Sequence, residues 1–185
     1  MAAVRREDIL DHLTYSERRA GIRASAMAAK DLRRVRLGEH LCFLFENAET
    51  LRYQVLEMIR MEKLVREADI RRELEVYNGI LGGPGELGCT LFIELPDERE
   101  RTMLLRRWCA LPEHLYLAFA DGSRAPARFD GSQISDGKLS SVQFLKFTVD
   151  GRIPAALVSE LPGLEGRATL DGPTLAALLA DLAEA

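Results

Sequence analysis

FENAETLRYQVLEMIRMEKL, residues 45–64, is the stretch around which the rest of the chain can be arranged. Asn47 can cap a helix that begins at Ala48, and Glu49 places a carboxylate in the first turn, where it favours the helix dipole. Neither glycine nor proline interrupts the residues that follow. The stretch therefore predicts a long central helix over residues 48–65, which the chain enters directly from a strand ending at Phe45.

One broad face of this predicted helix is apolar. At 3.6 residues per turn the face carries Leu51, Val55, Met58, Ile59, Met61 and Val65. Two polar residues, Gln54 and Glu62, fall inside it. A carboxylate there must find a partner or keep its proton, because burying an unpaired charge is costly. Gln54 and Glu62 therefore either meet a partner on a neighbouring element or serve a functional site, and the sequence leaves both possibilities open.

The residues before the central helix predict a β-hairpin. Residues 35–37 and 40–45 form its two strands, joined by a Gly-Glu turn. The second strand is apolar on both faces at its centre, which is typical of an inner strand. A glycine-rich loop over residues 79–88 precedes another strand, residues 89–95. A phosphate-binding loop would need Lys-Ser or Lys-Thr opening a helix at this point, so we interpret the loop as a connection.

The second half of the chain contains the strongest hairpin signal. An Asp-Gly turn joins residues 115–120 to residues 123–129. A further strand is predicted over residues 139–149, and its centre is apolar on both faces apart from Gln143 and Lys146. Other segments read as helices, over residues 5–12, 14–34, 70–78, 97–111, 153–159 and 173–182.

Strands that come singly and in hairpins, with helices between some of them, predict the α+β class. We expect a single domain over residues 1–185, with a largely antiparallel or mixed sheet and helices packed on it. Residues 1–33 are expected to form an N-terminal helical arm, and residues 34–185 the sheet-bearing body. No linker divides the two parts.

Composition limits the class of protein and its expected cellular location. The 185 residues are 47% hydrophobic, enough for a sizeable core, and the net charge of −4 argues against a dedicated nucleic-acid binder. No run of eighteen apolar residues would span a membrane, and the first residues lack the apolar segment of a secretion signal. The three cysteines have no CxxC spacing, so we expect a reducing, cytoplasmic location.

Polar residues of the central helix are the first candidates for a binding site. Tyr53, Glu57 and Arg60 share one side of the helix, so Arg60 could hold a carboxylate or phosphate while Glu57 orients it. An exposed ion pair is the simpler alternative. Together with two residues at the end of the next helix, the candidate ligand-binding residues are Arg52, Tyr53, Gln54, Glu57, Arg60, Glu62, Tyr77 and Asn78.

No catalytic motif or metal site is recognisable, so the question of enzymatic activity stays open. His40 and Cys42 alternate on one face of a strand, but two ligands do not make a zinc site. The sequence has no GxSxG motif. Arginines and a lysine crowd residues 18–36, yet aromatic residues are not interleaved with them, which argues against nucleic acid.

The sequence resembles an uncharacterised bacterial family, a domain of unknown function of similar length. The most specific match is Phe45-Glu46-Asn47 followed by the Arg-Tyr-Gln…Glu-Met…Arg…Glu pattern of residues 52–62. Tyr77-Asn78 also matches. Relatives tend to have histidine at the position of Gln143, so this chain departs from the pattern there. The resemblance covers nearly the whole chain and is best over residues 33–149.

The resemblance implies a metabolic context for the protein but no particular activity. Genes of the family often lie beside those of a rubrerythrin-like protein and an iron–sulfur oxidoreductase, which implies redox or oxidative-stress metabolism and one of these two proteins as a possible partner. The sequence has neither a cysteine cluster nor paired Glu-x-x-His motifs, so we predict no metal and no cofactor. The leading hypothesis is a non-enzymatic accessory or binding protein. The alternative is a small-anion-binding domain or enzyme with a pocket against helix 48–65.

Overall fold

A five-stranded antiparallel sheet forms the centre of the computed structural model, which describes residues 3–184. Its strands, in spatial order, are β1 (Arg34–Leu37), β2 (Leu41–Glu46), β3 (Glu86–Ile93), β9 (Val142–Thr148) and β6 (Arg128–Phe129). β1 and β2 form the predicted hairpin, and β2 is an inner strand whose six residues are all buried. The two-residue strand β6 pairs with β9 alone, so β9 is only partly covered on that side.

A second antiparallel sheet packs against the first. It contains β11 (Gly166–Thr169), β10 (Pro154–Ser159), β4 (Leu115–Phe119) and β5 (Arg124–Pro126), in that order. β4 and β5 form the hairpin predicted from the Asp-Gly turn. A two-stranded ribbon, β7 (Ile134–Ser135) and β8 (Lys138–Leu139), stands beside β9. Side chains from both sheets share one hydrophobic core with Trp108 and Leu178.

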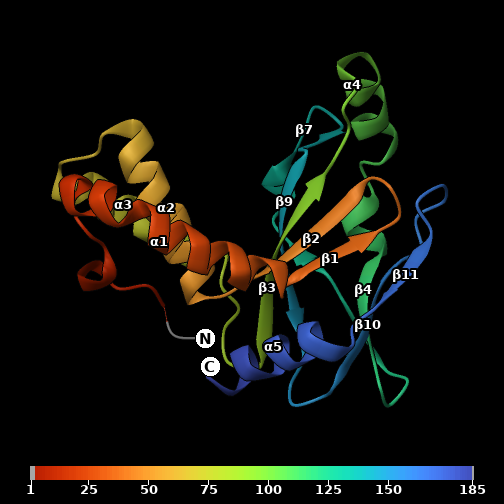
Figure 1. Ribbon diagram of the computed structural model, residues 1–185. Helices are drawn as coiled ribbons and strands as arrows, with labels where there is room; N and C mark the ends of the chain where they lie inside the picture. The colour runs from red at the N-terminus through yellow and green to blue at the C-terminus, as the bar shows by residue number, and fades with distance from the viewer. Residues whose placement is uncertain (1–2, 185) are drawn as a thin grey trace.

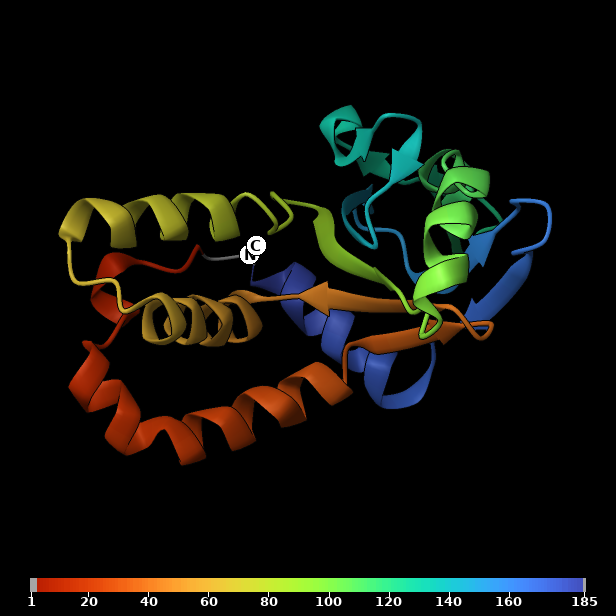
Figure 2. The ribbon, with the colours of Figure 1, turned by 90° about the horizontal axis from the view of Figure 1, so that it is seen from above.

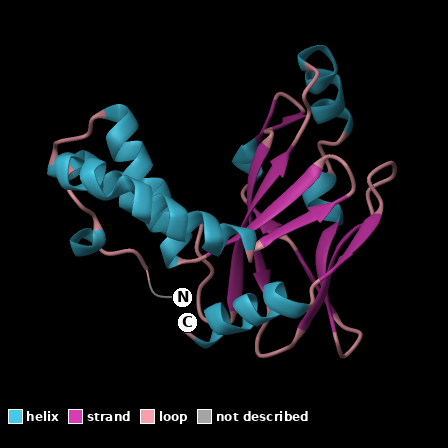
Figure 3. Ribbon diagram, viewed as in Figure 1, coloured by secondary structure: helices cyan, strands magenta, loops and turns pink. Residues whose placement is uncertain are grey.

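Three helices form a separate layer with a hydrophobic core of its own. They are α1 (His12–Asp31), α2 (Ala48–Glu62) and α3 (Glu67–Asn78). α1 and α3 flank α2, and the helices extend away from the sheets (Figures 1 and 2). The other two, α4 (Glu98–Arg107) and α5 (Gly172–Ala183), lie at opposite ends of the sheets (Figure 3). The α+β class and the antiparallel sheet are therefore confirmed. The helical layer extends beyond the predicted arm of residues 1–33, because α2 and α3 join α1 in it.

The central helix is shorter than its sequence predicts. Asn47 caps α2 as expected, accepting a hydrogen bond from the Thr50 amide at 3.0 Å. The helix ends at Glu62 because Lys63 adopts the left-handed conformation, with φ of 52°. Met61 is 67% exposed and Val65 is 83% exposed, so the predicted apolar face does not continue beyond Ile59. Glu62 is exposed rather than buried, and the expectation that it needs a partner was wrong.

Two further segments differ from their predicted structure. Residues 153–159, predicted as a helix, form β10, because an inner strand buried on both faces accepts the small apolar side chains found there. Residues 5–11 contain only the 3₁₀ turn Arg6–Asp8, and His12 already begins α1. Asp11 caps α1, since its carboxylate accepts from the Leu13 and Thr14 amides.

The glycine-rich loop lets two backbones touch. After α3 the chain passes directly over β3, and a Cβ placed on Gly88 would lie 2.1 Å from the Ile80 carbonyl oxygen. A Cβ on Gly82 would lie 2.3 Å from the Glu86 carbonyl oxygen. No side chain fits at either position, so these glycines are required by the close approach rather than by a ligand.

A buried ion pair joins the C-terminal helix to the helical layer. Arg33, just after α1, donates from Nε and Nη2 to the two carboxylate oxygens of Asp181 on α5, at 2.7 and 2.8 Å. Arg33 is 8% exposed and Asp181 is 3% exposed. The Asn47 amide, which caps α2, also donates to Asp181 at 3.2 Å. One carboxylate therefore fixes the ends of three helices.

Replacement of Asp181 by alanine should strongly destabilise the protein. The change leaves the Arg33 guanidinium buried without a counter-ion, which costs about 3–5 kcal/mol. Urea denaturation followed by circular dichroism would measure the free energy of unfolding. The control is Glu75→Ala, because Glu75 is exposed on α3 and should change stability by less than about 0.5 kcal/mol. An Asp181→Ala loss no larger than that of the control would show that the ion pair is unimportant.

Candidate functional site

The candidate residues of the central helix mostly bind other parts of the helical layer. Glu57 lies at the centre of a network between α1 and α2. It accepts from Arg19 Nε at 2.8 Å and Arg19 Nη2 at 3.0 Å, and from the hydroxyl of the buried Tyr15. Arg60 adds a longer contact at 3.4 Å. The Arg19 guanidinium lowers the pKa of Glu57 to about 2, while burial and the Glu57 carboxylate raise the pKa of Tyr15.

Arg52 and Tyr53 also have internal partners. Arg52 donates from Nε to the Asp8 carbonyl oxygen at 2.8 Å, which holds the N-terminal turn against α2. The Tyr53 hydroxyl accepts from Arg23 at 3.0 Å. The Lys30 ammonium lies 5.3 Å from the centre of the Tyr53 ring, and burial lowers the pKa of Lys30.

The end of α3 holds the N-terminal segment. The Asn78 side chain donates to the Val4 carbonyl oxygen and accepts from the Val4 amide, both at 2.9 Å. Burial raises the pKa of Tyr77, and the amide of Gln54 opposes this rise. Gln54 and Tyr77 are both half-buried. The structure thus brings Gln54 and Tyr77 together. The Asn78 side chain, by contrast, is occupied by its two hydrogen bonds to the Val4 backbone.

A buried acid that the sequence did not single out lies where β2 meets α2. The Glu46 carboxylate is 6% exposed and accepts from the Thr50 hydroxyl at 2.5 Å and the Thr90 hydroxyl at 2.7 Å. Burial raises the pKa of Glu46. Each oxygen has its hydrogen-bond donor, so the cluster is satisfied by the fold itself.

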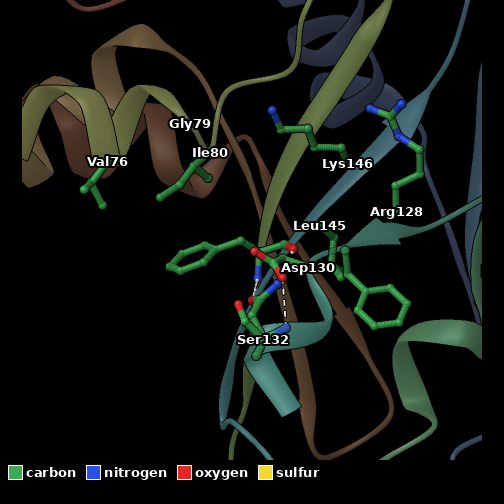
Figure 4. A pocket seen from close by; sticks show the side chains of 11 residues that line it. Val76, Gly79, Ile80, Arg128, Asp130, Ser132, Leu145 and Lys146 are labelled. Atoms are coloured by element: carbon green, nitrogen blue, oxygen red, sulfur yellow. Dashed lines mark hydrogen bonds between the residues drawn. The ribbon is translucent and has the colours of Figure 1, made fainter. Parts of the chain in front are cut away.

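A groove lies between the end of α3 and the edge of the first sheet. Its volume is about 680 Å³. Apolar side chains line most of it, with polar and charged groups from β6, β9 and the turn after β6; the lining residues are Val76, Gly79, Ile80, Arg128, Phe129, Asp130, Ser132, Gln133, Phe144, Leu145 and Lys146. Figure 4 shows Val76 and Ile80 projecting from the helical side, with Lys146 between Ile80 and Arg128 in this view. No residue of α2 lines this groove.

Two cations stand side by side at the groove. Arg128 on β6 and Lys146 on β9 are directly opposite in the antiparallel register, so both project from the same face. Arg128 binds the Glu86 carboxylate at 2.5 Å. Lys146 is half-buried and makes no hydrogen bond or ion pair with a side chain of residues 3–184. Because Arg128 is already paired with Glu86, Lys146 is the cation of the two that is left to bind an anion.

The sequence alone did not reveal the groove because its lining residues come from three separate segments, residues 76–80, 128–133 and 144–146. Lys146 was visible as a polar interruption in an apolar strand, and this was the one local signal. Neither Arg128 nor Gln133 stands out in the sequence, because short irregular strands and turns normally contain such residues. Pairing of β6 with β9 is a long-range contact that no residue pattern predicts.

The fold and groove define an α+β protein with a helical arm and a partly cationic groove at a sheet edge. The chain belongs to the family described as "Protein of unknown function (DUF3501)", whose model matches residues 3–182. This confirms the family resemblance. A solved structure of a protein of unknown function from Burkholderia pseudomallei K96243 is similar, with 29% identity and a TM-score of 0.86, covering 97% of this chain and 98% of that one. No curated protein matches the chain.

No helix within residues 3–184 has both the length and the apolar character needed to cross a membrane. No group of three or more His, Cys, Asp or Glu side chains in the same range is arranged to hold a metal ion.

The hydrogen bonds and ion pairs of Glu57 should make the free energy of unfolding depend on pH in the acidic range. Because the pKa of Glu57 falls from about 4.5 to about 2 on folding, its contribution is complete above pH 4.5 and is lost as the pH falls towards 2. Glu57→Gln should therefore lower the free energy of unfolding at pH 6 by ~2 kcal/mol and by much less near pH 2. Urea denaturation at several pH values would measure both.

Glu62→Gln is the matched control for that experiment, since Glu62 is on the same helix and exposed. It should leave the pH profile of stability unchanged. An equal loss in Glu57→Gln at pH 6 and near pH 2 would mean that its ion pairs with Arg19 and Arg60 do not contribute through charge.

Proposed function

We propose that this protein is a non-enzymatic binding protein whose groove between α3 and β9 holds an anionic group attached to an apolar one. The observation that carries the proposal is Lys146. The Lys146 ammonium is half-buried, lies directly opposite Arg128 and has no side-chain partner in the described chain, so it is available to pair with an anionic ligand.

The apolar lining supports the second half of the proposal. Val76 is 60% exposed and Phe144 is 42% exposed, although both are large hydrophobic residues. They lie on opposite walls of the groove that contains Lys146. Ligand sites typically combine a mainly apolar lining with a few polar groups that fix orientation, and this groove has that composition.

An anion site on the central helix is the alternative. One observation favours it: Arg60 Nε is buried and has no hydrogen-bond partner in the described chain. The other charged groups nearby are already paired, since Glu57 binds both Arg19 and Arg60. The groove is therefore the better-supported site, because its lysine is uncommitted while the charges of α2 hold the helices together.

We extend the proposal to the setting implied by the family resemblance. In this view the protein is cytoplasmic, and its partner is the iron–sulfur oxidoreductase or the rubrerythrin-like protein. The support is the resemblance alone. Purification of the tagged protein from its host at low salt, followed by mass spectrometry, tests it: stoichiometric recovery of either protein is expected, and recovery of the bare chain would count against the redox setting.

Lys146→Gln should weaken binding of 8-anilino-1-naphthalenesulfonate, a fluorescent sulfonate attached to aromatic rings. Loss of a charge-assisted contact should raise its dissociation constant about tenfold, equivalent to ~1.4 kcal/mol. A fluorescence titration would measure the constant. The control is Lys63→Gln, because Lys63 is exposed and outside the groove lining. Equal affinities of Lys146→Gln and Lys63→Gln would contradict the proposed site, provided both variants unfold at the same urea concentration as the parent.

A further inference from the structure

We infer that the natural occupant of the groove is an extended, acidic segment of a partner protein that crosses the edge of β9. This inference rests on the proposed function and adds the class of ligand to it. Three features of the described residues support it. They are a second hollow beside the groove, the charged residues that line the two hollows, and the hydrogen-bonded Gln133 side chain between the hollows.

The second hollow continues the groove past the sheet edge. Its volume is about 570 Å³, and it lies between α4, the β7–β8 ribbon and the start of β9. Ser132, Gln133 and Phe144 line both hollows, so the two are contiguous. A compact small molecule fits in either hollow, whereas only an extended ligand can occupy both.

Cations line both hollows. Arg128 and Lys146 line the first, and Arg101 and Lys138 line the second. Asp130 is the only carboxylate among the lining residues of the two, and Glu86 pairs with Arg128 from outside the lining. The chain as a whole carries a net charge of −4, yet at this surface the cations outnumber the carboxylates even when Glu86 is counted. Charge complementarity therefore selects an acidic partner and would increase its rate of association.

The side chain of Gln133, which is hydrogen-bonded to β9, forms a ridge between the two hollows. β6 ends at Phe129, and the side-chain amide of Gln133 then takes the place of the next strand residue. Its Oε1 accepts from the Phe144 amide at 2.6 Å, and its Nε2 donates to the Phe144 carbonyl oxygen at 3.1 Å. Because the β9 backbone is satisfied here, an added strand would have to displace Gln133.

The occupant is therefore held by side chains rather than by strand pairing. Its acidic groups meet the lysines on either side of the ridge, and apolar groups between them contact Phe144, which is 42% exposed. A single-stranded nucleic acid is the competing occupant, but the lining offers it few aromatic platforms, and alternating acidic and apolar groups match this surface better.

A fluorescein-labelled peptide of twelve residues, in which glutamates alternate with leucines and serines, tests the inference. Such a peptide extends at most ~40 Å. Fluorescence anisotropy would measure its affinity for the full chain and for the variants Lys138→Glu and Lys146→Glu. Each substitution should weaken peptide binding at least tenfold, because each removes a contact in a different hollow and introduces repulsion. A peptide with glutamine in place of every glutamate should bind at least tenfold more weakly than the acidic one.

The naphthalenesulfonate probe separates failure of this inference from failure of the proposed function. Lys146→Glu should weaken the probe, while Lys138→Glu should leave it unchanged and thereby also show that this variant is folded. If Lys138→Glu binds the acidic peptide as tightly as the parent, the occupant is confined to the first hollow and the inference is wrong, although the proposed function stands. If neither peptide nor probe responds to Lys146→Glu, both are wrong. Tighter binding of a twelve-residue oligothymidylate than of the peptide would also overturn the inference.

Discussion

Contact between two backbones at Gly88 is the constraint on which the groove depends. The chain leaving α3 passes over β3 with the Ile80 carbonyl oxygen so close that no Cβ fits on Gly88. This contact brings the end of α3 against the face of the first sheet that carries Lys146. The groove is the space that remains between them. Gly88 therefore acts through the absence of a side chain. The glycine-rich loop over residues 79–88 contributes to the groove by positioning the end of α3 against β3.

Charges serve opposite purposes in different parts of the molecule. In the helical layer they are paired: Arg33 with Asp181, and Glu57 with Arg19 and Arg60. Such pairs fix the relative positions of helices, because separating them would leave a charge buried without a partner. At the groove, by contrast, Arg128 and Lys146 lie side by side, and among the described residues Glu86 pairs with Arg128 alone. Lys146 is therefore left available for an anionic ligand, which would lower the free energy by pairing with it.

Local signals predicted the elements well, and long-range pairing accounts for what they missed. Asn47 caps α2 through its side-chain oxygen, and the Asp-Gly turn near Gly122 acts through its backbone conformation. Both signals are local, so the start of α2 and the β4–β5 hairpin were both correct. Residues 153–159 are a strand because two neighbouring strands bury them, which their proline and alanines do not reveal. Glu62 was misplaced because it is the last residue of the helix and is followed by a left-handed Lys63, which periodicity cannot predict.

Long-range contacts limited the prediction of the candidate site even more than the prediction of the fold. The sequence directed attention to α2, whose polar residues are numerous and regularly spaced, yet most of them bind α1 or the N-terminal segment. The sequence offers less about Lys146, which is one of two polar residues, with Gln143, at the centre of a largely apolar strand. Regular spacing of charges is common on helices that pack against other helices, because i, i+4 positions share a face. Lys146 lies on the less buried face of β9, so alternation along the strand explains its exposure, and its place in the groove rests on the long-range packing of α3 and β6 beside it.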